Sequence, residues 1–145
     1  MLMNMKDLLA VAHAHYFAVP AFNISNNMLL RGVIEASEEA DSPVIFAIHP
    51  DELAFVRPAF IKAAVEEANK TSIPVCIHLD HGSTMQQIMG AIQCGFTSVM
   101  IDASTRPLDE NIAISKKVVE LAHSINVSVE GELGTIGTTG PQAEA

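Results

Sequence analysis

Residues 75–82 read Val-Cys-Ile-His-Leu-Asp-His-Gly, a short apolar run that ends on an aspartate and a histidine. Short runs of apolar, β-branched residues that are closed by polar ones are typical of strands buried in a sheet. We predict a strand over residues 75–79 and four similar strands over residues 18–22, 44–48, 98–101 and 127–129. Successive runs start 26, 31, 23 and 29 residues apart, which leaves room for one helix and two loops between each pair.

The intervals between the strands have the periodicity of helices. They predict helices over residues 28–40, 53–70, 83–95 and 107–123, after a short leading helix over residues 6–13. Pro58 predicts a bend or a break in the second of these, because proline cannot donate the helical hydrogen bond. Residues 83–86 (Ser-Thr-Met-Gln) have the pattern of a capping box, and Gly95 is placed to end that helix.

Apolar strands joined by helices indicate an α/β fold with a parallel sheet covered by helices. Two architectures have this pattern. An open five-stranded sheet is complete at about 130–150 residues, whereas a TIM (β/α)₈ barrel needs about 250. By length alone, the 145 residues favour the open sheet. No linker interrupts the pattern, so residues 1–145 are expected to form a single domain.

The composition excludes several classes of protein. Hydrophobic residues make up 49% of the chain and charged residues 17%, which excludes an intrinsically disordered chain. The formal charge of −9 leaves no basic footprint for nucleic acid or for an anionic membrane surface. No apolar run reaches the roughly 18 residues of a membrane span, and the start lacks the features of a secretory signal. We therefore expect a cytoplasmic protein.

Polar side chains follow all five predicted strands. Ligands of parallel α/β folds bind at the carboxyl ends of the strands, so these residues are the candidates for a shared site. Helix capping explains an aspartate or asparagine there, but histidine and glutamate are not favoured caps. The residues are Asn23, His49, Asp80, His81, Asp102, Glu130 and Glu132.

His81, Asp102 and Glu132 are of the types that bind zinc or a similar divalent ion. Asp80 is a separate carboxylate, and a neighbouring acid often supports the ligands at such sites. His78 lies two residues before Asp80, hence on the same face of the strand, and we expect it to be a core histidine with its hydrogen bonds satisfied. No lysine follows a strand, which argues against a Schiff-base mechanism.

Four segments carry a resemblance to a known family. Residues 19–23 (VPAFN), 78–82 (HLDHG), 98–104 (SVMIDAS) and 129–134 (VEGELG) resemble the class II, metal-dependent ketose-bisphosphate aldolases, which include the fructose- and tagatose-1,6-bisphosphate aldolases. Members of that family are TIM barrels of roughly twice this length. The resemblance thus implies the first five strands of such a barrel with their helices, a partial barrel, in place of the open sheet.

The resemblance also implies an activity, a cofactor and roles for individual residues. The activity is reversible cleavage of a ketose 1,6-bisphosphate into dihydroxyacetone phosphate and glyceraldehyde 3-phosphate, by homo-oligomers (dimers or tetramers). Asp80 matches the residue that shuttles the proton, and Asn23 one that contacts the substrate. His81 matches a zinc ligand. Asp102 and Glu132 match a nearby metal position, which a second divalent or a monovalent cation could take.

The chain departs from the family pattern in three respects. The other two zinc histidines and the phosphate-binding loops of the family follow later strands. His49 stands where a small hydroxyl residue is common, and Glu144 alone represents an acidic cluster after the glycine-rich loop over residues 134–140. We therefore expect the 145 residues to be inactive alone. The alternative is a non-catalytic open-sheet binding module or a degenerate aldolase homologue.

Overall fold

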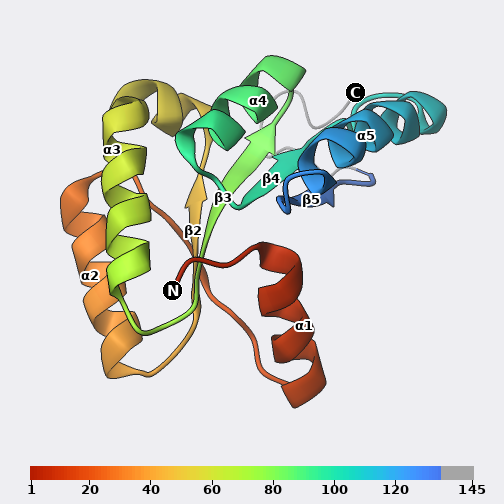
Figure 1. The fold of residues 1–145 in the computed structure, drawn as a ribbon. Helices are drawn as coiled ribbons and strands as arrows, with labels where there is room; N and C mark the ends of the chain where they lie inside the picture. The colour runs from red at the N-terminus through yellow and green to blue at the C-terminus, as the bar shows by residue number, and fades with distance from the viewer. Residues whose placement is uncertain (135–145) are drawn as a thin grey trace, which may run out of the picture.

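A computed structural model describes residues 1–134 of the chain and shows one parallel sheet with helices on both sides (Figure 1). Glu144 and all but the first residue of the glycine-rich loop lie outside the described residues. No helix of the described part has both the length and the apolar character that a membrane crossing requires. The strands are β1 (Ala21–Asn23), β2 (Val44–Ile48), β3 (Val75–Gly82), β4 (Ser98–Ile101) and β5 (Ser128–Gly131). The helices are α1 (Met5–His15), α2 (Asn27–Glu39), α3 (Pro50–Lys70), α4 (Met85–Cys94) and α5 (Leu108–His123).

The order of the strands decides between the two architectures. The strands lie side by side in the order β1-β2-β3-β4-β5, and every neighbouring pair is parallel. An open doubly wound sheet reverses its strand order at a switch point, whereas a barrel keeps the order of the sequence. Within residues 1–134, β1 and β5 each pair on one side only. The predicted partial barrel is therefore confirmed, and the open-sheet arrangement is wrong.

Alternate side chains of the strands enter two separate apolar layers. Val44, Phe46 and Ile48 of β2 belong to the large core that the sheet forms with α2, α3, α4 and α5. The intervening Ile45 packs instead with Leu8 of α1, in a small cluster on the opposite face. Helices α2 to α5 thus cover the outer face of the curved sheet, and α1 lies against its inner face (Figure 1).

Most predicted elements are confirmed, with changes at their ends. The strands over residues 44–48 and 98–101 have the predicted bounds, whereas the first, third and fifth strands extend further toward their carboxyl ends. The helix over residues 50–70 is broken as Pro58 predicts, and the break falls at Arg57, whose φ is 64° and ψ is 164°. The capping box of α4 consists of Thr84 and Gln87, one residue later than predicted, and Gly95 ends that helix as expected.

His49 is a helix cap, contrary to the view that histidine would not fill this role. Its Nδ1 accepts a hydrogen bond from the backbone N–H of Asp51 at 3.3 Å. Its own backbone N–H donates to the Glu52 carboxylate at 3.0 Å. Together these contacts form a capping box at the start of α3, which explains why the helix begins three residues earlier than predicted.

Gly82 lies too close to β4 to carry a side chain without a clash. A Cβ at this position would lie 2.7 Å from the backbone oxygen of Met100 and 2.8 Å from Leu79 Cδ2. Neither a backbone carbonyl nor a branched carbon within a packed core can yield by that much without disturbing its neighbours.

We expect Gly82→Ala to lower the free energy of unfolding by about 1–3 kcal/mol, because overpacking forces the two strands apart. Urea denaturation measures the change. The matched control is Gly90→Ala within α4, where a Cβ would have no atom within 4 Å. That control should raise stability by about 0.5–1 kcal/mol, since alanine costs less conformational entropy in a helix. Equal stability of Gly82→Ala and the unmodified chain would contradict the close approach.

Candidate metal and acid–base site

Three metal-ligating side chains converge at the carboxyl ends of the last three strands. His81 lies near the end of β3, while Asp102 and Glu132 directly follow β4 and β5. His81 Nδ1 is 3.0 Å from Asp102 Oδ2 and 3.7 Å from Glu132 Oε2. One ligand atom from each of the three lies within 4.8 Å of the other two. The structure therefore brings together the three residues that the sequence nominated as metal ligands.

An irregularity in β3 directs His81 toward this cluster. The pairing of β3 with β4 shifts register between Leu79 and Gly82, and His81 has a left-handed backbone with a φ of 55°. Such a conformation costs a non-glycine residue about 1–3 kcal/mol and persists only where its surroundings impose it. Here the His81 N–H donates to Met100 Sδ at 3.4 Å, and the Asp102 N–H donates to the Gly82 carbonyl at 2.7 Å.

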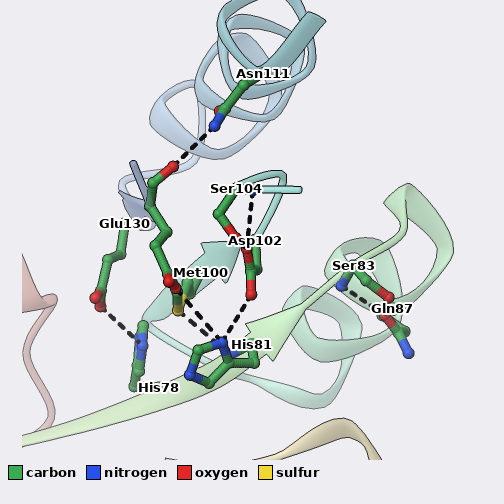
Figure 2. Close-up of polar contacts among 10 residues, drawn as sticks. His78, His81, Ser83, Gln87, Met100, Asp102, Ser104, Asn111 and Glu130 are labelled. Carbon is green, nitrogen blue, oxygen red and sulfur yellow. Dashed lines mark hydrogen bonds and ion pairs between the residues drawn. The ribbon is translucent and has the colours of Figure 1, made fainter. Parts of the chain in front are cut away.

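Asp102 is held by two hydrogen bonds to one of its oxygens. Its Oδ1 accepts from the Ser104 hydroxyl at 2.6 Å and from the Ser104 backbone N–H at 3.0 Å. These bonds, and then the hydrogen bond with His81, lower the pKa of the Asp102 carboxyl. The carboxylate therefore stays charged, with Oδ2 aimed at His81 (Figure 2).

The pKa of His81 is raised, mainly by its hydrogen bond with Asp102. Burial lowers this pKa, but by less than the hydrogen bond raises it. The negative charges of Asp80, Asp102 and Glu132 raise it further. Since a carboxylate can only accept, Nδ1 carries the proton of this hydrogen bond. In the neutral imidazole, Nε2 then carries no proton. An ion bound among the three side chains would replace the proton on Nδ1.

The spacing of the cluster suits a small divalent ion. Zinc bonds of about 2.0–2.2 Å in a tetrahedral arrangement place neighbouring ligand atoms roughly 3.3–3.5 Å apart. The two distances from His81, 3.0 and 3.7 Å, bracket that value, and the ligand oxygens of Asp102 and Glu132 lie within 4.8 Å of each other. The residues present thus fit the metal that the sequence implied.

A second histidine supports the inner face of the sheet. His78 is buried, with 4% of its surface exposed, and its Nδ1 lies 2.9 Å from Ser98 Oγ. Its Nε2 is 3.2 Å from Glu130 Oε2, an ion-pair distance that falls outside regular hydrogen-bond geometry. This contact with His78 lowers the pKa of the Glu130 carboxyl. His78 is therefore a core residue as predicted, but the expectation that its hydrogen bonds are satisfied is wrong for Nε2, which has only the ion-pair contact with the half-exposed Glu130.

The other nominated residues lie outside the three-residue cluster. Asp80 is partly buried next to His81, and its side chain has no hydrogen bond within residues 1–134. Asn23 is exposed at the end of β1, two strands away from β3. His49 caps α3, and its ring centroid lies 6.5 Å from that of His81.

Two residues that the sequence did not nominate, Ser104 and Asn111, hold the cluster in place. Ser104 follows Asp102 at the two-residue spacing of a side-chain-capped turn, a signal that could have been recognised. Asn111 is buried on the inward stripe of α5, with its side-chain amide bonded to the Glu132 carbonyl at 2.8 Å. An asparagine on an apolar stripe is a detectable signal, but its partner cannot be read from the sequence.

Comparison with known proteins places this geometry in a family. The model of the family described as "Fructose-bisphosphate aldolase class-II" matches residues 3–145. A fructose-bisphosphate aldolase of Giardia intestinalis is 43% identical over 138 residues, covering 94% of this chain and 43% of that protein. A probable fructose-bisphosphate aldolase of Bacillus subtilis is 45% identical over 141 residues, covering 94% of this chain and 49% of that protein.

The fold gives the same result. The crystal structure of the YdjI aldolase from Escherichia coli K12 superposes with a TM-score of 0.89 at 35% identity, covering 94% of this chain and 53% of that one. The chain thus spans about half the length of the relatives it matches. Because the family model matches residues 3–145, which is nearly the whole of this chain, the chain belongs to the class II fructose-bisphosphate aldolase family.

Proposed function

We propose that this chain forms the first five strands of a zinc-dependent aldolase barrel that cleaves a ketose 1,6-bisphosphate into dihydroxyacetone phosphate and glyceraldehyde 3-phosphate. The observation that carries the proposal is the convergence of His81, Asp102 and Glu132 at the carboxyl ends of adjacent strands. Family membership and the sequential strand order support it.

In this proposal the metal and a carboxylate divide the chemistry. Zinc, when bound, acts as a Lewis acid that stabilises the negative charge left next to the ketone as the C3–C4 bond breaks. Asp80 accepts the proton of the C4 hydroxyl as that carbon becomes an aldehyde, and C3 takes up one proton to complete dihydroxyacetone phosphate; in the reverse reaction C3 loses a proton and Asp80 returns one to the C4 oxygen. His81 and the two acids beside it are the residues that would hold the ion, which leaves Asp80 free for the proton.

The placement of the lysines agrees with a metal mechanism. All five lysines of the chain lie within helices α1, α3 and α5 and none at the carboxyl end of a strand: Lys6, Lys62, Lys70, Lys116 and Lys117. An imine mechanism needs a lysine in the pocket with its amine unprotonated. The described strand ends instead offer carboxylates and histidine.

A proton competes with the metal for His81. Because the pKa of His81 is raised above its ordinary 6.5, the imidazole is still partly protonated at a pH where an unperturbed histidine is neutral. Zinc affinity should therefore fall as the pH drops through the raised pKa of His81. Protons should compete less well with zinc when the charge of Asp102, which accepts the hydrogen bond from His81, is removed.

We expect Asp102→Asn to lower the pKa of His81, because the substitution removes the negative charge that stabilises the imidazolium. Titration of the imidazole C–H signals by NMR in metal-free buffer measures it. Glu66→Gln is the control, since Glu66 pairs with Lys70 on α3 and its loss should leave His81 unchanged. An identical titration of His81 in Asp102→Asn and the unmodified chain would show that the ion pair does not form in solution.

The proposed role of Asp80 requires a complete barrel. We therefore suggest a chimera in which these 145 residues replace the matching half of the Bacillus subtilis relative. It should cleave fructose or tagatose 1,6-bisphosphate with added zinc, whereas the 145 residues alone should not. Asp80→Asn in the chimera should lower kcat by about 10²–10⁴-fold, the usual contribution of general acid–base catalysis, with zinc binding retained.

A coupled assay for the triose phosphates measures both rates. The matched control is Asp51→Asn, which removes a carboxylate from the exposed first turn of α3 and should leave kcat unchanged. Undiminished activity of Asp80→Asn would contradict the assigned proton transfer. Turnover by the 145 residues alone would contradict the need for the later strands.

A further inference from the structure

Helix α5 carries a buried amide on the stripe that faces the sheet. Asn111 is 6% exposed and lies on the same side of the helix as the fully buried Val118 and Ala122. Burying an amide is unfavourable unless its polar atoms find partners. The position would otherwise suit an apolar side chain, so the contacts of this amide indicate what it does.

Both polar atoms of the Asn111 amide form hydrogen bonds: the nitrogen donates one and the oxygen accepts one. The Nδ2 group donates to the backbone carbonyl of Glu132 at 2.8 Å (Figure 2). The Oδ1 atom accepts from the Ser115 hydroxyl at 3.1 Å, one turn further along the helix. The hydroxyl thereby orients the amide so that its donor faces Glu132.

The Glu132 residue follows the last paired residue of β5, so its carbonyl takes no part in the pairing of β4 with β5. The pairing of β5 with β4 ends at Gly131 opposite Ile101, and β5 is the last strand of the described sheet. Asn111 therefore anchors the first residue after the strand to a packed helix. From that anchored backbone the Glu132 side chain reaches to 3.7 Å from His81 Nδ1.

We propose that Asn111 is a positioning residue for the candidate metal site, holding the Glu132 backbone so that its carboxylate faces His81. This inference rests on the proposed function, because it takes Glu132 to be a metal ligand. A glutamate side chain has three rotatable bonds, so a carboxylate on an unanchored strand end would occupy the ligand position for only part of the time.

A purely structural role would look different in experiment. If Asn111 only joined α5 to β5, its loss would destabilise the chain without acting through Glu132. If it positions Glu132, its loss should weaken zinc binding only while the Glu132 carboxylate is present. The thermodynamic coupling between the two residues therefore separates the two roles.

The experiment is titration calorimetry with zinc chloride on the 145-residue chain. Asn111→Leu keeps the size and burial of the side chain but removes the donor, and it should weaken zinc binding about tenfold, the lower end for the loss of a supporting contact. In a Glu132→Gln background, the same substitution should change the Kd by less than about twofold, since the ligand it serves is already lost.

Val118→Ala is the matched control. Val118 is fully buried on the same stripe of α5 and contributes to the core, so its truncation should lower stability in urea while leaving the Kd for zinc unchanged. Should Asn111→Leu fail to fold, Asn111→Ser removes the same donor with a smaller change in the packing, and the same results are expected.

The inference alone would be overturned by wild-type affinity in Asn111→Leu, or by equal weakening with and without the Glu132 carboxylate. Equal weakening by Val118→Ala would likewise assign the effect to helix packing and overturn it. If the unmodified chain bound no zinc, the proposed metal site would fail, and this inference with it. The two proposals are thus distinguishable: the metal site is tested by zinc binding to the unmodified chain, whereas the role of Asn111 is tested by the differences in Kd between the variants.

Discussion

The close approach of β3 and β4 at Gly82 is the constraint on which the candidate site depends. With no side chain at this position, the Met100 carbonyl oxygen can lie only 2.7 Å from where a Cβ would stand. The register shift of the two strands and the left-handed backbone of His81 occur at the same place. Their joint effect is that the end of β3 turns toward the end of β4, so that the imidazole meets the Asp102 carboxylate.

The site concentrates negative charge around a single histidine. Asp102 and Glu132 both face His81, and the charge of Asp80 also acts on it. Like charges at such short range repel each other. Hydrogen bonds from Ser104 to Asp102 offset part of this repulsion. The positive charge of the protonated imidazole, which the raised pKa of His81 favours, offsets another part. A bound cation would offset the remainder, which is why the cluster is chemically consistent with a metal site.

The sequence predicts two of the interior strands, β2 and β4, better than the other three. Residues 44–48 and 98–101 were predicted at their observed bounds, because their apolar runs coincide with the buried part of the sheet. The first strand is displaced to Ala21–Asn23, since its pairing is set by a single neighbour and not by its own apolar character. Similarly, the carboxyl ends of the strands identify the metal-ligating residues, but the 3.0 Å contact of His81 depends on a register shift that no local pattern encodes.

The two faces of the sheet differ in how they can tolerate evolutionary or engineered change. The outer face is an ordinary apolar layer, in which one residue can replace another of similar volume. The inner face instead links three strands through the ring of His78, with Ser98 on one nitrogen and Glu130 on the other. Diversity among descendants of this sequence should therefore accumulate in the apolar layer, while the inner face changes only when several residues change together.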